Sequence, residues 1–455
     1  MPGPEGPLDG LPDAFEGERT TEGSALASVE GDASALRGRP CALVRPKGVG
    51  DVELLVRWAR AHRRPLVARG GGTSLNGESV PSDGAVVVDL SGWRSIGELE
   101  VAAGTVRVAP GVVNRDLQEH LAGTGWFFPP NPGSWRSSTI GGNIATNASG
   151  PRSLRYGSTR RWVREVEAVL GTGERVRVGS SLPKRSVGPD LVGLFVGSEG
   201  TLGILTGATL ALAPAPVRRL GLALPVPPGH SLSAVASGIL RATGLGLSAL
   251  EYLDATCAEA LSRVPGSRLS GEAALLLAES ESSDEAEETE RLERWAGLLP
   301  ALGLSSEPTV YPDADRLWTL RGESGTTLDA IWGARVREDV VVPVARLDEM
   351  LREVDRVAER FGVRTIVYGH LGEGNLHPNL VIDPLSTRGR TARAALLEAA
   401  RRLGGSVSGE HGIGAVKRDQ LIGEVGAPML RTLRAVKAAC DPDGILNPGK
   451  LLPEE

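Results

Sequence analysis

The spacing of apolar positions predicts alternating strands and helices in the first half of the chain. Residues 49–62 carry Val52, Leu55 and Trp58 at helical intervals, which predicts an amphipathic helix with one buried face. Short apolar runs rich in β-branched residues flank this helix and have the length of buried strands. Strands that alternate with helices in this way are typical of α/β domains. The predicted strands of this half are residues 42–46, 65–69, 85–90, 162–170 and 176–178.

The pattern changes after the Pro-Ala-Pro-Val segment at residues 214–217, where we predict a domain boundary. Beyond it, longer amphipathic helices separate the strands, which favours an α+β, ferredoxin-like sheet covered by helices on one face. We therefore predict a leader with a first helix (1–37), an α/β domain (38–216) and an α+β domain (217–455). The predicted strands are residues 220–226, 247–253, 273–278, 363–368 and 378–382, and the predicted helices are residues 232–243, 283–299, 345–361, 391–404 and 429–439.

Composition and charge exclude several classes of protein. The 455 residues are 41% hydrophobic and 23% charged, and the net charge of −6 argues against a nucleic-acid binder that neutralises phosphates. The three cysteines have no disulfide or iron–sulfur spacing, which fits a reducing, cytoplasmic setting. The chain shows no signal-peptide pattern and no long apolar segment, so we expect a soluble protein and leave peripheral membrane contact open.

A glycine-rich segment follows the second predicted strand. Residues 69–77 read Arg-Gly-Gly-Gly-Thr-Ser-Leu-Asn-Gly. Successive glycines leave backbone N–H groups free to converge on an anion, and the hydroxyl groups of Thr73 and Ser74 lie beside them. The segment is therefore a candidate pyrophosphate cradle. It matches neither the P-loop nor the Gly-x-Gly-x-x-Gly spacing, and a glycine-rich surface loop is the alternative interpretation.

A second unusual run, residues 138–150, consists mostly of small and amide side chains. It can bury little apolar surface, so a packed segment here would line a ligand rather than fill a core. Small side chains let a flat ring lie against the backbone, and Asn143 and Asn147 can donate and accept hydrogen bonds along its edge. The alternative is a long irregular loop, although loops of this length in compact domains are usually functional.

Half of the six histidines lie in two glycine-framed segments near the C-terminus. Residues 368–377 read Tyr-Gly-His-Leu-Gly-Glu-Gly-Asn-Leu-His, and residues 408–414 read Ser-Gly-Glu-His-Gly-Ile-Gly. On one unbroken strand His370 and His377 would point to opposite faces, because the side chains of a strand alternate. The glycines permit a turn or bulge that re-aims the side chains, so the two histidines can share a ligand.

Two imidazoles and one carboxylate make a ligand set for a divalent metal with an open coordination position. His370, His377 and Glu410 are the candidate ligands, and His411 is then a candidate base. The alternative is that these histidines are hydrogen-bonded residues that hold turns together.

Six ordered motifs together resemble the vanillyl-alcohol oxidase / p-cresol methylhydroxylase (PCMH) superfamily. The nearest branch is that of the D-lactate, glycolate and D-2-hydroxyglutarate dehydrogenases, and the resemblance extends over about residues 20–453. It implies a PCMH-type FAD-binding domain of two α/β subdomains, followed by an α+β domain that covers the flavin ring. The motifs are residues 69–77, 139–150, 197–203, 368–377, 409–414 and 447–450.

The resemblance implies a cofactor site for non-covalent FAD, because Thr73 stands where members with covalently attached flavin can carry a histidine. The glycine loop would bind the pyrophosphate, the run of small residues would line the flavin and ribityl chain, and Glu199 would contact the adenine side. The implied FAD-binding residues are Arg69, Gly70, Gly71, Gly72, Thr73, Ser74, Asn76, Gly77, Pro132, Gly133, Thr139, Gly141, Gly142, Asn143, Ala148, Ser149, Tyr156, Glu199, Gly203, Ile204 and Asn447.

The resemblance also implies the metal site. His370, His377 and Glu410 match the family's ligands for a divalent metal, which we expect to be zinc or manganese. His411 matches the general base that takes the proton of the substrate hydroxyl group.

Substrate-binding residues follow from the same resemblance. Arg321 matches the arginine that binds the substrate carboxylate, and Asn375 and His411 would lie beside the substrate. Arg337 stands near the position of a lysine that binds a second carboxylate in dicarboxylate-specific members. The neighbouring Glu338 opposes that role, so the sequence leaves the contact of Arg337 open.

The implied function is FAD-dependent oxidation of a D-2-hydroxy acid to the 2-oxo acid, by metal-assisted proton abstraction and hydride transfer to flavin N5. Electrons would pass to an external acceptor such as a quinone, a cytochrome, an electron-transfer flavoprotein or an iron–sulfur subunit. The chain would be cytoplasmic or peripheral at the inner face of the membrane, and a homodimer is compatible with the resemblance. The alternatives are a non-catalytic flavin-binding subunit of a glycolate oxidase-like complex and an alkylglycerone-phosphate synthase-like flavoenzyme.

Overall fold

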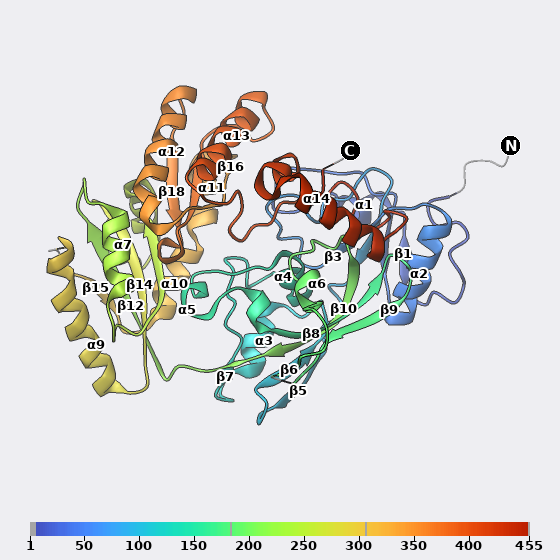
Figure 1. The fold of residues 1–455 in the computed structure, drawn as a ribbon, viewed down its shortest axis with the longest axis horizontal. Coiled ribbons are helices and arrows are strands. Elements are labelled where there is room, and N and C mark those ends of the chain that lie inside the picture. The colour runs from blue at the N-terminus through green and yellow to red at the C-terminus, as the bar shows by residue number, and fades with distance from the viewer. Residues whose placement is uncertain (1–5, 183, 305–306, 454–455) are drawn as a thin grey trace. The chain divides into compact units, whose positions relative to one another are not determined.

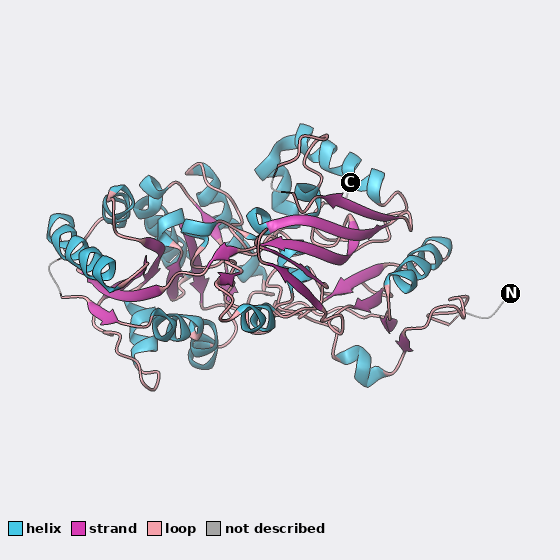
Figure 2. Ribbon diagram, turned by 90° about the horizontal axis from the view of Figure 1, so that it is seen from below, coloured by secondary structure: helices cyan, strands magenta, loops and turns pink. Residues whose placement is uncertain are grey.

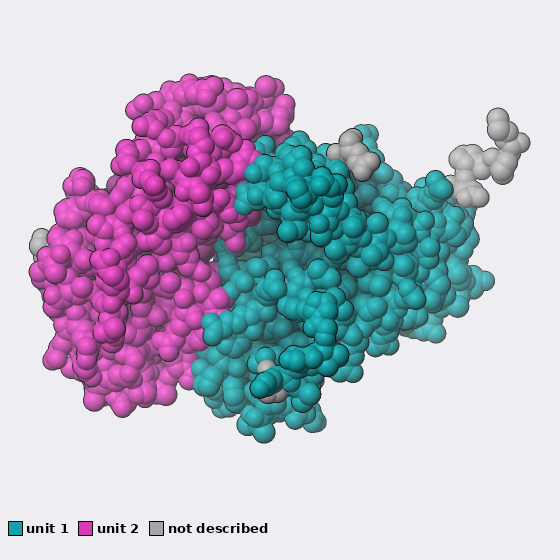
Figure 3. Space-filling model, viewed as in Figure 1, with its two compact units in different colours: residues 1–149, 158–214, 410–455 teal, residues 150–157, 215–409 magenta. Residues whose placement is uncertain are grey.

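The computed structural model describes residues 6–182, 184–304 and 307–453 and divides the chain into two compact units. Residues 1–5 of the predicted leader lie outside the described residues. Each unit is discontinuous in sequence, and Figure 3 gives each unit its own colour. Unit 1 comprises Met1–Ser149, Ser158–Pro214 and Glu410–Glu455, and unit 2 comprises Gly150–Gly157 and Ala215–Gly409.

The first sheet of unit 1 has the strand order β1-β2-β4-β3. β2, β4 and β3 run parallel, with α2 as the helical connection between β2 and β3, as the apolar pattern predicted (Figure 1). β1 pairs with β2, so part of the predicted leader belongs to this sheet. The bounds are β1 Glu18–Thr20, α1 Gly23–Ala27, β2 Ala42–Arg45, α2 Val49–Ala61, β3 Leu66–Arg69 and β4 Val86–Asp89.

The second sheet of unit 1 is antiparallel, with the order β5-β6-β10-β8-β9. Its core includes Val106, Val166 and Leu210, against which Leu117 of α3 and Ile140 of α4 pack. The bounds are β5 Ile96–Glu100, β6 Thr105–Val108, α3 Asn114–Leu121, β7 Trp126–Phe127, α4 Ile140–Thr146, β8 Val163–Leu170, β9 Arg175–Gly179, α6 Val192–Phe195, β10 Gly203–Ala211 and β11 Ala213–Pro214.

The C-terminal segment completes unit 1. Its helix α14 (Leu421–Cys440) begins before the predicted helix at 429–439 and bends at Gly426, where φ is 75°. Leu446 then forms a parallel bridge with Leu66 beside β3, and Ile445 and Leu446 are buried in the core of the first sheet. Residues 445 and 446 are therefore structural members of the first unit.

Unit 2 is built on a sheet with the order β15-β12-β14-β13-β18-β19-β16. Its first four strands have the 4-1-3-2 order of a ferredoxin-like fold, and all neighbours are antiparallel. This confirms the predicted fold class. The bounds are α5 Ser153–Tyr156, β12 Arg218–Val226, α7 Leu232–Arg241, β13 Leu247–Leu253, α8 Ala255–Ser262, β14 Ala274–Ser282, α9 Glu285–Leu298, β15 Thr309–Tyr311, α10 Ala314–Gly322, α11 Ser324–Trp332, β16 Val336–Arg337, β17 Val340–Val341, α12 Leu347–Phe361, β18 Thr365–Gly369, β19 Asn375–Leu380 and α13 Thr387–Arg402.

The sheet of unit 2 is buried on both faces, where the sequence pattern predicted cover on one face. Ala223 of β12 and Leu277 of β14 belong to a core formed with α8, α10 and α11. The alternate residues Leu222 and Leu276 point to the other face and are also fully buried. Figure 2 shows helices on both sides of this sheet. Apolar residues at consecutive positions, such as Leu275, Leu276 and Leu277 of β14, are consistent with this double cover.

Candidate functional site

The glycine loop of unit 1 packs tightly against the segment before α4. A Cβ atom at Gly70 would lie 2.1 Å from Thr139 Oγ1, and one at Gly71 would lie 2.3 Å from the carbonyl oxygen of Ser137. No side chain fits at either position. Gly72 has φ +63°, a conformation that favours glycine. The two sequence motifs therefore form one continuous backbone surface.

The run of small residues forms a short helix rather than a long irregular loop. Thr139 caps α4 by accepting a hydrogen bond from the N–H of Gly142, and Asn147 ends it in the left-handed conformation. Gly141 lies against Pro110, with only 2.7 Å between its Cβ position and Pro110 Cβ. Small residues are needed here because the helix approaches neighbouring backbone so closely.

Three buried donors in this part of unit 1 fit a bound cofactor. Arg69 Nη1, Ser138 Oγ and Asn143 Nδ2 have no hydrogen-bond partner among the described residues. A buried donor without a partner is costly, so a ligand that accepts these bonds would stabilise the region. Phosphate oxygens and the polar edge of a flavin are acceptors of this kind. The residues present therefore fit the FAD that the sequence predicts.

Other predicted cofactor residues are engaged in contacts within unit 1. The Asn76 amide donates to the carbonyl oxygens of His411 and Gly412, at 3.1 and 2.7 Å. The Glu199 carboxylate accepts from the N–H groups of Ile413 and Gly414, at 2.7 and 2.8 Å. These two side chains hold the backbone of the loop that carries His411.

Glu78 is a second buried carboxylate beside this loop. Burial and the neighbouring Glu199 raise the pKa of Glu78 well above its ordinary value. Burial also raises the pKa of Glu199 to about 7, although the backbone hydrogen bonds and Lys450 oppose the shift. The amide of Asn447 donates to the backbone carbonyls of both glutamates, at 2.8 and 2.7 Å.

The remaining predicted cofactor residues have varied surroundings. Ile204 is buried in the core of the first sheet, and Gly203 lies against Phe195. The Ser149 hydroxyl donates to Glu410 Oε2 at 2.9 Å. Tyr156 belongs to unit 2, where its hydroxyl donates to Glu281 at 2.7 Å and burial raises its pKa. The remaining predicted positions Thr73, Ser74, Gly77, Pro132, Gly133 and Ala148 all lie in unit 1.

The first histidine motif is an antiparallel hairpin of unit 2. β18 pairs with β19, and Tyr368 lies opposite His377. Residues opposite each other on neighbouring strands point to the same face, and His370 follows Tyr368 by two positions. Chain reversal at Gly374, where φ is +72°, thus brings both imidazoles to one side. The ring centroids of His370 and His377 are 5.2 Å apart.

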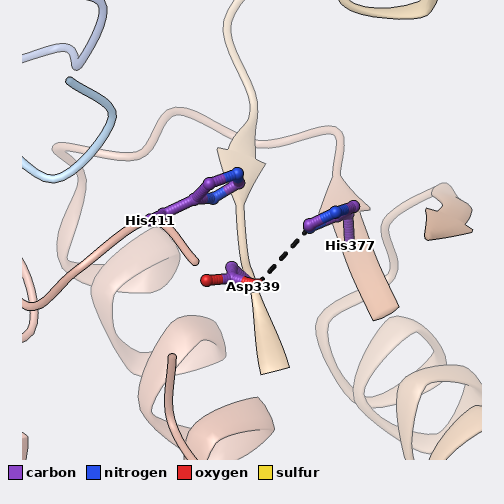
Figure 4. Close-up of side chains that lie close together, drawn as sticks. All are labelled: Asp339, His377 and His411. Carbon is purple, nitrogen blue, oxygen red and sulfur yellow. Dashed lines mark ion pairs between the residues drawn. The ribbon is translucent and has the colours of Figure 1, made fainter. Parts of the chain in front are cut away.

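Each of these buried histidines faces a carboxylate of unit 2. His370 Nδ1 lies 2.5 Å from Glu251 Oε1. His377 Nδ1 lies 3.6 Å from Asp339 Oδ1, the ion pair drawn in Figure 4. The Asn375 amide donates to the same Asp339 oxygen at 2.8 Å, so it orients this carboxylate.

Arg321 lies in the same network. Its Nε donates to Glu251 Oε2 at 3.0 Å, its Nη1 donates to Ser324 Oγ at 2.9 Å, and its Nη2 forms an ion pair with Glu251 Oε2 at 2.9 Å. Burial raises the pKa of Glu251, but His370 and Arg321 outweigh burial, so the net shift is downward. Arg337, the other predicted substrate arginine, forms an ion pair with Asp329.

The second histidine motif begins in unit 2 and ends in unit 1. The Gly409 N–H donates to Asp339 Oδ2 at 2.8 Å, and the Ser408 hydroxyl donates to the same oxygen at 3.1 Å. Glu410 and His411 are the next two residues, and they open the last segment of unit 1. A single peptide bond therefore separates Glu410 from a residue bound to Asp339.

Sequence reasoning missed Glu251 and Asp339 as neighbours of the histidines. Glu251 is the only charged residue of β13, a strand that is otherwise apolar or small, and this isolated charge was an available signal. Asp339 lies in the segment that contains Arg337, but the sequence-based prediction for this segment named only Arg337 and Glu338.

The structure also bears on membrane insertion. Among residues 6–182, 184–304 and 307–453, no helix combines the length and the apolar character needed to span a bilayer.

Two family models match the chain. Residues 40–179 match a model described as "FAD binding domain", and residues 220–451 match one described as "FAD linked oxidases, C-terminal domain". These matches correspond to the two parts of the chain that hold the glycine loop and the histidine motifs.

Several curated proteins are similar over most of their length. D-lactate dehydrogenase of Archaeoglobus fulgidus is 36% identical, covering 90% of this chain and 91% of that protein. Glycolate oxidase subunit GlcD of Bacillus subtilis is 32% identical, covering 91% and 90%. D-2-hydroxyglutarate dehydrogenase of Stutzerimonas stutzeri is 34% identical, covering 90% and 91%.

Solved structures share the fold. p-Cresol methylhydroxylase superposes with a TM-score of 0.79 at 16% identity, over 95% of this chain and 93% of that chain. Alkyldihydroxyacetonephosphate synthase superposes with a TM-score of 0.73 at 17% identity, over 94% and 83%. The family models and the curated relatives together show that this chain belongs to the FAD-linked oxidases and is a flavin-dependent oxidoreductase.

Proposed function

We propose that the protein oxidises a D-2-hydroxy acid to the 2-oxo acid and passes the electrons from FAD to an external acceptor. The names of its relatives support this proposal. D-lactate, glycolate and D-2-hydroxyglutarate differ in size and charge, but each has a hydroxyl group on the carbon next to a carboxylate. The chemistry common to these relatives is therefore oxidation at C2 of a 2-hydroxy acid.

The observation that carries the proposal is the pair of buried histidines in unit 2. The Glu251 carboxylate can only accept a hydrogen bond, so His370 donates to it from Nδ1, and Nε2 is then the ring nitrogen that can bind a metal ion. Asp339 Oδ1 lies 3.6 Å from Nδ1 of His377, at the distance of an ion pair and not of a hydrogen bond. Carboxylates behind the ring nitrogens are typical of metal-binding histidines. The donor set fits a divalent ion such as zinc or manganese.

Glu410 is the proposed third ligand. It follows Gly409, which is bound to Asp339, and its carboxylate is oriented by the Ser149 hydroxyl. A divalent ion held by His370, His377 and Glu410 would act as a Lewis acid toward the 2-hydroxyl group.

The chain's own residues bind the substrate and move one proton. A guanidinium has five N–H donors, and among the described residues Arg321 donates from Nε to Glu251 and from Nη1 to Ser324, with Nη2 in an ion pair with Glu251, so N–H groups remain for a substrate carboxylate. His411 takes the proton of the 2-hydroxyl group, a step worth roughly 10²–10⁴ in rate. FAD, when bound, accepts the hydride from C2.

Metal removal tests the proposal directly. Treatment with a chelator should abolish D-lactate-type turnover, and Zn²⁺ or Mn²⁺ should restore it, while the FAD content stays constant. Full activity in a sample shown to be metal-free by elemental analysis would contradict the ligand assignment.

Anaerobic mixing with 2-hydroxy acids tests the reaction class. D-Lactate, glycolate or D-2-hydroxyglutarate should bleach the flavin absorbance in a single turnover. A synthase related to alkyldihydroxyacetonephosphate synthase, or a non-catalytic flavin-binding subunit, would leave the flavin oxidised with all three acids. A higher bleaching rate with D-2-hydroxyglutarate than with the other two acids would indicate that the site binds a second carboxylate. Arg337 is the candidate for that contact, and it would have to release Asp329.

A further inference from the structure

Glu251 is a buried charge on an otherwise apolar strand. It lies on β13 and is 0% exposed, and the alternation of the strand places it on the same face as Leu253. Taking a carboxylate out of water costs several kcal/mol unless partners compensate it. The contacts of its two oxygens therefore show why the strand retains it.

The two carboxylate oxygens serve different partners. Oε2 accepts from Nε of Arg321 and forms an ion pair with its Nη2, and Oε1 accepts from Nδ1 of His370. Arg321 comes from α10 and His370 directly follows β18, so the side chain of Glu251 on β13 joins three parts of unit 2. The Arg321 guanidinium also lies over the Tyr368 ring, with Cζ 4.7 Å from the ring centroid.

This arrangement fixes two properties at once. The bond to Oε1 selects the His370 tautomer whose Nε2 carries a lone pair. The contacts with Oε2, with the hydrogen bond to Ser324, fix the plane of the Arg321 guanidinium and so the direction of its remaining N–H groups. Neither partner can keep its geometry if the carboxylate is lost.

We propose that Glu251 is a positioning residue that couples metal binding at His370 to carboxylate binding at Arg321. This inference rests on the proposed function and extends it. Loss of Glu251 therefore weakens the affinity for the divalent ion and raises KM for the hydroxy acid together. A group that acted only on stability would affect ion binding no more than another buried, arginine-bound carboxylate of the same sheet does.

Glu279 provides a matched control. It lies on the neighbouring strand β14, is also 0% exposed, and binds arginines, here Arg152 and Arg219. Its other partners are Ser248 and Trp318, and no histidine is among the partners that the structure describes for it. Replacing it removes a buried, arginine-bound carboxylate without touching the histidine hairpin.

The experiment compares the FAD-loaded wild type with Glu251→Gln and Glu279→Gln. Affinity for Zn²⁺ is measured by competition with a chromophoric chelator, and FAD content and circular dichroism report the fold. Glu251→Gln should bind Zn²⁺ about 10- to 100-fold more weakly, the usual effect of losing a carboxylate behind a metal-bound histidine. Glu279→Gln should bind it as the wild type does.

Three outcomes distinguish a failure of the positioning role of Glu251 from a failure of the proposed metal site. A wild type that binds no Zn²⁺ or Mn²⁺ defeats the proposed metal site itself. Normal Zn²⁺ affinity in a folded Glu251→Gln protein, with the wild type binding tightly, overturns the positioning role alone. Equal weakening in both glutamine variants assigns the effect to general destabilisation and also overturns it.

Spectroscopy of the wild type gives a second readout, and a conservative variant extends it. With ¹⁵N-labelled histidine, the Zn²⁺-loaded protein should show one metal-bound imidazole protonated on Nδ1 whose signals change in Glu251→Asp, because the shorter side chain cannot reach both partners. A metal-bound set with every proton on Nε2 would refute the assignment.

Discussion

At the scale of single residues, some side chains are proposed to contact the reacting atoms, and others hold those side chains in place. The backbone carbonyl of His411, and not its ring, accepts the hydrogen bond from Asn76. The imidazole of His411 can therefore be removed without breaking the contact that holds its loop. This separation makes His411 the residue whose substitution tests chemistry most directly.

His411→Ala should slow flavin reduction by a D-2-hydroxy acid at least about 100-fold, because the proton of the hydroxyl group loses its acceptor. The FAD content should stay at the wild-type level. Stopped-flow bleaching of the flavin measures the rate, and His120→Ala, which removes an exposed histidine of α3, is the control. An unchanged bleaching rate would show that another group accepts the proton.

At the scale of elements, the hairpin of β18 and β19 determines where the two histidines lie. Gly374 has φ +72°, and a Cβ atom there would lie 1.9 Å from the carbonyl oxygen of Val342. Gly362, at the end of α12, also has a left-handed conformation, but its Cβ would meet only Arg388 Nη2 at 3.7 Å. The two glycines differ in steric room, and both have a left-handed backbone.

Gly362→Ala should cost about 1 kcal/mol of stability, the usual penalty for an alanine in this conformation. Gly374→Ala should cost several times more, because backbone atoms must move as well, and it should lower the metal content of the purified protein. Urea unfolding and elemental analysis give both quantities. Equal destabilisation by the two substitutions would mean that the backbone around Gly374 can move to accommodate a Cβ atom at little cost in stability.

The histidine motif shows how much of an element's structure can be predicted from the sequence. The three glycines indicated a turn, and strands were predicted on both sides of it. The pairing of Tyr368 with His377 depends on the tertiary structure and cannot be read from the sequence. Without it, the prediction that His370 and His377 share a face stayed a hypothesis. Glu251 was harder to find, because it lies 119 positions from His370 and nothing local connects them.

At the scale of the whole molecule, buried carboxylates link stability to pH. Burial raises the pKa of Glu199 to about 7 from an ordinary value of 4.5, and burial and the neighbouring Glu199 raise the pKa of Glu78 well above its ordinary value. The folded state therefore holds protons that the unfolded state releases above pH 4.5. Stability should fall as the pH rises from about 4.5 through 7, by on the order of 3 kcal/mol for a shift of this size.

Glu78→Gln should reduce this dependence, because the amide stays neutral at every pH. The difference in unfolding free energy between the variant and the wild type, measured in urea from pH 5 to 8, should increase in favour of the variant. A difference that is constant across this range would show that Glu78 is not protonated in the folded protein.

The domain boundaries show what the sequence could not provide at this scale. From the Pro-Ala-Pro-Val segment we predicted that the second domain begins at residue 217. In the structure, the main segment of unit 2 begins at Ala215. The return to unit 1 at Glu410 has no change in composition to mark it. It depends on contacts such as those of Asn76 and Glu199, which lie more than two hundred positions away in the chain.

The interleaving of the two units has a consequence for biosynthesis. Unit 1 takes its last segment, residues 410–455, from the part of the polypeptide that follows unit 2, whereas unit 2 is complete at Gly409. On the ribosome the second unit can finish folding before the first. Unit 1 keeps its β3 edge and its Asn76 amide uncovered until residues 410–455 have been synthesised, and a premature stop codon near residue 410 would damage that unit and spare the other.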